Sequence, residues 1–153
     1  MGETETGGET LRARHVLEYP FRRSLGPILE RFFTGLTEQR FVGSRLDDGR
    51  VVVPPAEFDP VTAAALGPDR LTEVGPGGVV TTWTWVGAPG PKHPLDRPFA
   101  WALIRLDGAD APFLHAVDVA QESAMRTGLR VKPRWAAAPV GSIRDVACFE
   151  AEA

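Results

Sequence analysis

The hydrophobic positions divide the chain into a short helical part and a longer β-rich part. In "SLGPILERFFTGLTEQR", apolar residues recur at helical spacing, which predicts one helix over about residues 25–39. Ser24 stands where an N-cap is expected, and Pro27 fits the first turn. The apolar positions are Ile28, Leu29, Phe32, Phe33 and Leu36. Because a helix this short is unstable alone, we expect this side to be buried against the rest of the chain or against a partner protein.

From residue 40 onward, short β-rich runs alternate with Gly, Pro and Asp. The runs "RFVGSR" and "RVVV" flank Asp47-Asp48-Gly49, which predicts a hairpin. The segment "AEFDPVTAAALGPD" is expected to form a connecting loop or a short turn of helix. A second hairpin is predicted where "FAWALIRLDG" and "APFLHAVDVA" flank residues 107–110, and "LRVKPRWA" and "SIRDVACFE" add two more strands.

The run "GGVVTTWTWVG" is the longest predicted strand. A period of two places Thr81, Trp83 and Trp85 on one face. The other face then holds Val80, Thr82, Thr84 and Val86. Since both faces carry large side chains, we expect a long, curved strand covered on two sides. Several short strands that follow a long bent one predict a small Greek-key barrel, of which the OB-fold is the commonest form, with a β-sandwich as the alternative.

Composition narrows the classes of function. The chain has 17 Lys and Arg against 20 Asp and Glu, a net charge of -3, so no strong field attracts nucleic acid or an anionic membrane.

The single Cys148 cannot form an internal disulfide, and within "DVACFE" it is expected to be a buried strand residue in a reducing compartment. No apolar run approaches the ~20 residues of a membrane span, and "MGETETGGET" lacks signal-peptide features. A cytoplasmic location is therefore expected.

Catalytic motifs are absent from the sequence. It contains no G-x-S-x-G, Walker or H-x-x-x-H pattern, and His15, His93 and His115 lie far apart. His115 is expected either to be a half-buried, hydrogen-bonded strand residue or to face a ligand across the barrel mouth. This pattern favours a noncatalytic protein.

The stretch "GSRLDDGRVVVPPAEFDPVTA" has the outline of a two-knuckle zinc ribbon without cysteine. It resembles the zinc-ribbon and OB-fold proteins that accompany thiolases, whose ribbon pattern is C-x2-C-G-x4-P-P-x3-C-P-x-C. Gly49 and the three prolines match this pattern. The four ligand positions hold Arg45, Asp48, Asp59 and Thr62. Because structural zinc needs thiolate and imidazole ligands, we expect a metal-free ribbon, with an Arg45–Asp59 ion pair partly replacing the metal.

The phrases "LEYPF", "GPILERFFTGL", "DGRVVVPPAEFDP", "TTWTW", "RPFAWALIRLDGAD" and "LHAVDV" resemble a zinc-free branch of this family. The resemblance implies an accessory subunit, with no cofactor of its own, for a thiolase-fold steroid side-chain aldolase or a sterol-carrier-protein-type thiolase in bacterial sterol degradation. A hot-dog-fold enoyl-CoA hydratase is a further implied partner, and a heterotetramer around a thiolase-like dimer is the implied assembly. The substrate of such a complex is an acyl-CoA.

This interpretation gives a mainly β architecture in four parts. They are a disordered tail at 1–14, an N-terminal helical segment at 15–39, a degenerate ribbon module at 40–69 and a five-stranded OB-fold barrel at 70–150. The expected partner interface is Tyr19, Phe21, Ile28, Phe32, Phe33 and Leu36.

Two basic segments suggest ligands. The loop "GAPGPKHPLDRPF" holds Lys92, His93 and Arg97, which are either solvated or placed to bind the phosphates or adenine end of coenzyme A. The segment "KPRW" offers the rival hypothesis, a single-strand nucleic-acid site built on Lys132, Arg134 and Trp135.

Overall fold

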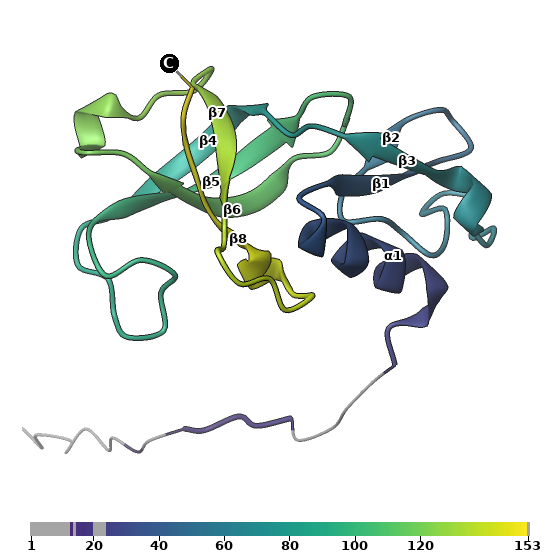
Figure 1. Ribbon diagram of the computed structural model, residues 1–153, viewed down its shortest axis with the longest axis horizontal. Helices are drawn as coiled ribbons and strands as arrows, with labels where there is room; N and C mark the ends of the chain where they lie inside the picture. Colours follow the sequence, from purple (N-terminus) through teal and green to yellow (C-terminus); the bar gives the residue numbers. More distant parts are fainter. Residues whose placement is uncertain (1–12, 14, 20–23, 153) are drawn as a thin grey trace, which may run out of the picture.

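The computed structural model describes residue 13 and residues 15–19 and 24–152 (Figure 1). Within these residues the protein is mainly β, as predicted, with one α-helix and eight strands. Two predictions lie outside the described residues. One is the tail over residues 1–14, apart from Ala13, and the other is the assignment of Phe21 to a partner interface. No helix in the described part of the chain has the length and apolar character needed to cross a bilayer.

The helix α1 (Gly26–Thr37) confirms the predicted helical segment. Its N-cap is Leu25, which makes no side-chain capping bond, so the prediction of Ser24 as the cap is wrong. Pro27 lies in the first turn, where the missing N–H costs nothing. The helix packs against β1, and its apolar side is buried there.

A small antiparallel sheet of order β2-β1-β3 forms the ribbon-like module. Its strands are β1 (Phe41–Arg45), β2 (Val51–Val52) and β3 (Leu71–Val74). The predicted hairpin is present, with Ser44 opposite Val52 and Gly49 at a φ of 88° in the turn. The 3-10 turn η1 (Pro68–Arg70) leads into β3. Because β3 pairs with β1, this module extends to Val74, beyond the predicted boundary at residue 69.

The remaining strands form the closed five-stranded barrel that the OB-fold prediction requires. They are β4 (Gly78–Val86), β5 (Phe99–Leu106), β6 (Phe113–Asp118), β7 (Arg130–Trp135) and β8 (Val146–Ala151), in the order β4-β5-β6-β8-β7. The 3-10 turns η2 (Glu122–Ala124) and η3 (Ile143–Asp145) precede β7 and β8. Pairing of β4 with β7 closes the barrel, with Gly78 opposite Val131. A Cβ at Gly78 would lie 2.6 Å from the carbonyl oxygen of Arg105, so close packing requires glycine.

A β-bulge in β4 corrects the predicted alternation of this strand. The register against β5 shifts between Val80 and Thr82, and one residue is left unpaired there. Val80 is therefore fully buried on the same side as Trp83 and Trp85, which pack partly buried against the core, while Thr82 and Thr84 are exposed. The expectation that β4 is covered on both of its faces is therefore wrong. The bulge places the large side chains of β4 on one side of the strand.

The ribbon-like module and the barrel share one hydrophobic core. The Phe41 ring of β1 lies 5.9 Å from the Phe113 ring and 6.0 Å from the Phe149 ring, both of which belong to the barrel. The backbone N–H of Val51 donates to the Asp110 carboxylate at 2.7 Å. In Figure 1, α1, η3 and the loop over residues 87–98 all lie on the lower side of the molecule. That side holds a candidate site.

Candidate functional site

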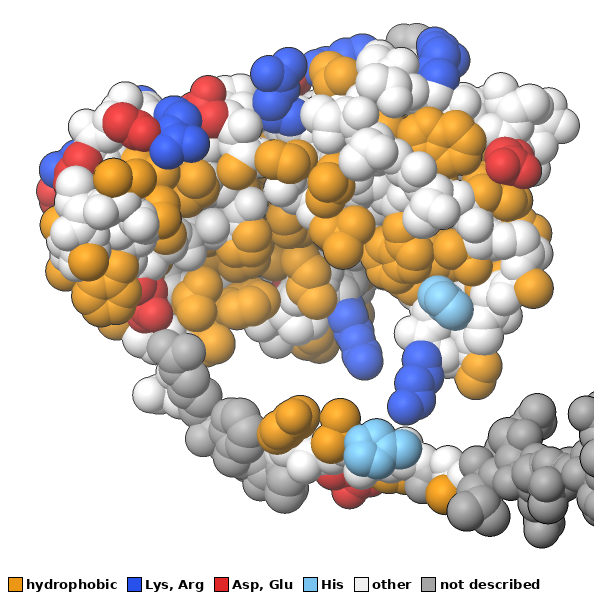
Figure 2. Space-filling view, turned by 180° about the vertical axis from the view of Figure 1, so that it is seen from behind, with side chains coloured by type: hydrophobic (Ala, Val, Ile, Leu, Met, Phe, Trp, Pro, Cys, Tyr) orange, Lys and Arg blue, Asp and Glu red, His pale blue; other side chains and the backbone are white. Residues whose placement is uncertain are grey.

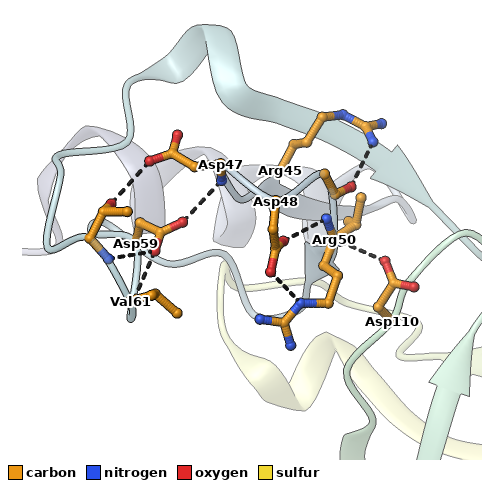
Figure 3. Close-up of polar contacts among 10 residues, drawn as sticks. Arg45, Asp47, Asp48, Arg50, Asp59, Val61 and Asp110 are labelled. Atoms are coloured by element: carbon orange, nitrogen blue, oxygen red, sulfur yellow. Dashed lines mark hydrogen bonds and ion pairs between the residues drawn. The ribbon is translucent and has the colours of Figure 1, made fainter.

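The two loops of the ribbon-like module meet at the Asp59 carboxylate (Figure 3). It accepts backbone hydrogen bonds from Asp47 at 2.9 Å, Val61 at 2.8 Å and Thr62 at 3.0 Å. Asp47 belongs to the first loop, and Val61 and Thr62 belong to the second. These backbone bonds, with that of Asp47 the largest cause, lower the pKa of Asp59 to about 2. The carboxylate is only 3% exposed and stays ionised at neutral pH.

Asp47 extends this network. Its carboxylate accepts a hydrogen bond from the Thr62 hydroxyl at 3.0 Å and one from the Arg70 guanidinium at 3.2 Å. The first loop, the second loop and η1 are thus joined through two neighbouring carboxylates. We call Asp47, Asp59, Thr62 and Arg70 the ribbon network.

The predicted Arg45–Asp59 ion pair is wrong. Arg45 donates to the Gly49 carbonyl at 3.1 Å, within its own hairpin. Asp48 likewise bonds its neighbour Arg50, at 3.0 Å to the backbone and 2.7 Å to the side chain. Of the four positions that hold metal ligands in the ribbon pattern, only Asp59 and Thr62 form hydrogen bonds that link the two loops. The residues that the structure describes contain no cluster of three or more His, Cys, Asp or Glu that could hold a metal ion.

A hollow of about 1070 Å³ lies between the loop over residues 87–98, the β5–β6 pair and η3. We call it the barrel pocket. Its apolar lining is Pro91, Pro94, Leu95, Trp101, Leu114, Ile143, Val146 and Ala147. Its titratable lining is Lys92, His93, His115 and Arg144, with no acidic side chain among the lining residues. Figure 2 shows hydrophobic side chains across this face and two basic side chains beside a hollow at its lower edge.

The structure brings two of the three predicted ligand residues, Lys92 and His93, into the barrel pocket. The His93 Nδ1 accepts a hydrogen bond from the Gly90 N–H at 2.7 Å, and the ring packs edge-on against Phe99 at 5.7 Å. Arg97 is not among the pocket residues, because its guanidinium forms a two-bond ion pair with Asp118.

His115 lies deeper than predicted. Its side chain is 6% exposed, and its ring lies 5.7 Å from Phe113 and 5.6 Å from Phe149. The Nδ1 atom has no hydrogen-bond partner within the described part of the chain. Burial lowers the pKa of His115, an effect opposed by backbone groups of Ala116 and Ile143, so the imidazole is neutral at pH 7. Burial of an unpaired polar atom costs about 1–3 kcal/mol.

Sequence reasoning missed Arg144 and Trp101 as pocket residues. Both reach the pocket through tertiary structure, since Arg144 lies in η3 and Trp101 in β5. The Ser142 cap of η3 fixes the turn that carries Arg144, because Ser142 accepts the Arg144 N–H at 3.2 Å. No spacing in the sequence pairs this turn with the loop over residues 87–98.

A second hollow, of about 630 Å³, lies between α1, β1 and β3. Charges of both signs line it, and Arg40 pairs with both Glu38 and Glu73. Because acidic and basic side chains both line this hollow and Arg40 is already paired, it is the weaker candidate for a charged ligand.

The helical part of the predicted partner interface needs correction. Ile28, Phe32 and Leu36 are only 3%, 1% and 1% exposed, because they pack into the chain's own core. They are therefore not surface contacts in this structure, and Phe33 is partly buried beside them. Tyr19 is 72% exposed.

Cys148 is a core residue, as predicted. It is fully buried, and burial raises the pKa of its thiol to about 11. At neutral pH the thiol is therefore protonated and is not a ready nucleophile.

The basic residues of the nucleic-acid hypothesis are neutralised by their neighbours. Lys132 lies 3.7 Å from Glu150, and Arg134 lies 2.9 Å from Asp118. Trp135 packs against the core, with its ring 5.1 Å from that of Phe41. With these cations paired and the aromatic ring turned inward, a base-stacking groove is not favoured.

The fold and site define an OB-fold protein whose ribbon-like N-terminal module is joined through the Asp59 carboxylate. Residues 71–136 match the family described as ChsH2, C-terminal OB-fold domain. The resemblance to the OB-fold accessory family is thereby confirmed over these residues, which span β3 to β7.

Two solved structures share the fold. The first is a protein of unknown function from the DUF35 family of Sulfolobus solfataricus, at 23% identity and a TM-score of 0.56, covering 71% of this chain and 78% of that one. The second is the Ltp2-ChsH2(DUF35) aldolase, at 16% identity and a TM-score of 0.57, covering 88% of this chain and 98% of that one. A comparison with curated protein sequences found no match.

Proposed function

We propose that this protein is a noncatalytic OB-fold subunit that binds and stabilises a thiolase-fold enzyme. The observation that carries the proposal is the ChsH2-type match over residues 71–136, supported by the fold shared with the Ltp2-ChsH2(DUF35) aldolase. The partner is a steroid side-chain aldolase or a sterol-carrier-protein-type thiolase, acting in bacterial sterol side-chain degradation. A hot-dog-fold enoyl-CoA hydratase is the second proposed partner, and a heterotetramer is the proposed assembly.

The surface proposed for the thiolase-fold partner lies on the second ribbon loop and the N-terminal segment. Phe58 and Val61 are 60% and 79% exposed on the ribbon loop. Val16, Leu17 and Tyr19 are more than half exposed in the segment before α1. Exposed apolar side chains of this size are typical of contact sites, and the ribbon network holds the loop in place for such contact.

The contribution to catalysis is proposed to be steric and electrostatic. The subunit would help enclose the partner's acyl-CoA site, with Lys92 and His93 on the loop over residues 87–98 supplying polar contacts. Enclosure excludes water from a retro-aldol or thiolytic carbon–carbon cleavage carried out by the partner's residues.

Mixing this protein with the thiolase-fold chain of the same host tests the proposal by light scattering. A complex of two copies of each chain is expected. Phe58→Asp together with Val61→Asp should weaken assembly, because carboxylates would be buried in an apolar contact. The matched control is Thr82→Asp with Thr84→Asp, at exposed positions of β4, which should assemble normally. Failure of the unmodified proteins to associate contradicts the proposal.

A further inference from the structure

The loop over residues 87–98 is tied to the barrel by an ion pair at its end. Its other hydrogen bonds are internal, since the Gly90 N–H donates to His93 Nδ1 at 2.7 Å and the His93 N–H donates to the Gly90 carbonyl at 3.0 Å. Within the described residues, the hydrogen bonds from this loop to another part of the chain run from the Arg97 guanidinium to the Asp118 carboxylate, at the end of β6. The polar attachment of the loop therefore depends on Asp118.

Apolar packing of this loop is sparse. Residues 91–98 are exposed apart from Leu95, which is partly buried against the small core cluster around Phe99. The His93 ring adds one edge contact with Phe99. A loop with so few buried contacts opens at little cost in free energy, so its polar attachment matters more for its position.

The Asp118 carboxylate is shared by two guanidinium groups. Its side chain is 9% exposed, and its Oδ2 atom accepts a hydrogen bond from Arg97 while lying 2.9 Å from a nitrogen of Arg134. Burial would raise the pKa of Asp118, but the bonds from Arg97 and Arg134 outweigh burial and lower that pKa, so the carboxylate is ionised at neutral pH.

The two arginines depend on Asp118 to different degrees. Arg134 also lies 3.6 Å from Glu150, whereas Arg97 has no second acidic partner among the described residues. Loss of the Asp118 charge would therefore release Arg97 and leave it beside a like charge on Arg134, which favours movement of the loop away from the barrel.

We propose that Asp118 is a positioning residue for the loop over residues 87–98. By holding Arg97, it fixes the loop that presents Lys92 and His93 to the barrel pocket. Asp118 itself is not among the pocket residues and acts on the pocket through Arg97. Its role in the reaction rests on the proposed function, in which Lys92 and His93 supply polar contacts within the complex.

The distance between two spin labels, measured by double electron–electron resonance, reports the position of the loop in the full chain. Lys92→Cys places one label on the exposed loop, and Thr82→Cys places the other at an exposed position of β4. Cys148 should stay unlabelled, because its thiol is buried and protonated. We expect a narrow distribution of distances, which broadens after Asp118→Asn. An equally narrow distribution in both proteins overturns the proposal.

Asp107→Asn is the matched control. Like Asp118, Asp107 accepts two hydrogen bonds from one arginine, but that arginine is Arg130 on β7 and not a residue of the loop. The distribution of distances should therefore stay narrow. Equal broadening by Asp107→Asn and Asp118→Asn would show a general loosening of the barrel and contradict the positioning role.

Arginine variants show which cation matters. Arg97→Gln should broaden the distribution as much as Asp118→Asn, and combining the two should broaden it no further, since both remove one interaction. Because Arg97 is 57% exposed, its replacement tests the proposal even if Asp118→Asn does not fold. Arg134→Gln leaves Arg97 bound and should keep the distribution narrow. Equal broadening by Arg97→Gln and Arg134→Gln would contradict the assignment.

Kinetics of the assembled complex separate positioning from a loss of stability. Arg97→Gln and Asp118→Asn should raise the KM for a steroid acyl-CoA several-fold and leave kcat unchanged, because the loop is proposed to contact bound substrate and not the reacting bond. Arg97→Lys keeps the charge and should raise KM less. An unchanged KM in a variant whose loop is broadened overturns the role of Asp118 in the reaction.

Failure of the proposed function gives a different result. If this protein and a thiolase-fold chain do not assemble, the proposed complex is removed, while the effect of Asp118→Asn on the label distances is still measured on the chain alone. Assembly with an unchanged distance distribution removes only the positioning role.

Discussion

The Asp59 carboxylate accepts the backbone N–H of Asp47 at 2.9 Å and so joins two loops that a zinc ion joins in the ribbon pattern this chain resembles. A single acceptor group holds N–H donors from both loops, and the Thr62 hydroxyl adds a second link through Asp47. The ribbon shape thus persists because the backbone of each loop is anchored to a buried anion, without thiolate or imidazole ligands.

Asp59→Asn should lower the melting temperature by several degrees. The amide replaces one acceptor oxygen with a donor and removes the charge that three N–H groups solvate. Thermal denaturation followed by circular dichroism measures the change. Asp48→Asn is the matched control, since Asp48 bonds only within its own exposed hairpin, and its effect should be much smaller. Equal effects from the two substitutions would contradict the anchoring role.

Chelation should leave stability unchanged. The anchor of the two ribbon loops is a carboxylate, so neither EDTA nor added Zn²⁺ is expected to shift the melting temperature. A fall in melting temperature with EDTA, reversed by zinc, would show that a metal contributes to the fold.

Acid should remove the contribution of Asp59. Its pKa falls from 3.8 to about 2 on folding, so the carboxylate favours the folded state fully above pH 4. That contribution is lost as the pH falls through the folded pKa of about 2. The difference in melting temperature between the native protein and Asp59→Asn should therefore be constant from pH 7 to about pH 4 and shrink below it. A difference that grows on acidification would contradict this linkage.

Phe32→Ala should destabilise the fold by about 3–5 kcal/mol, because the ring is 1% exposed in the shared core. Urea denaturation measures the loss. Phe58→Ala removes the same group from a side chain that is 60% exposed and should cost far less. A small effect of Phe32→Ala would instead support its original assignment to a partner surface.

Native Cys148 should resist thiol reagents at pH 8. The residue is fully buried, and the pKa of its thiol is raised to about 11, so little thiolate exists and the reagent has no access. Reaction with Ellman's reagent is expected only after unfolding in urea. Rapid labelling of the folded protein would show that β8 opens readily.

Local patterns determined much of the fold. Alternation and turn residues predicted both hairpins, and helical spacing predicted α1, because these signals depend on neighbouring residues. The bulge at Val80 and Thr82 was missed, since a single unpaired residue is set by the register against β5.

The candidate site was only partly predictable for the same reason. Lys92 and His93 share one loop and were found together, whereas Arg144 and Trp101 join them through tertiary contacts. Arg97 has the right chemistry, but it pairs with Asp118, which lies on another strand. The helix spacing showed that Phe32 is buried without showing which surface buries it.

Affinity purification of the tagged protein from its native host grown on a sterol tests whether the protein is a subunit of a thiolase-fold enzyme. Mass spectrometry identifies and quantifies the chains that copurify. We expect a thiolase-fold chain in stoichiometric amount, whose retro-aldol or thiolytic activity on a steroid acyl-CoA falls when this protein is removed. Recovery of the protein without such a chain, or a partner whose activity and stability do not depend on it, would contradict the proposed function.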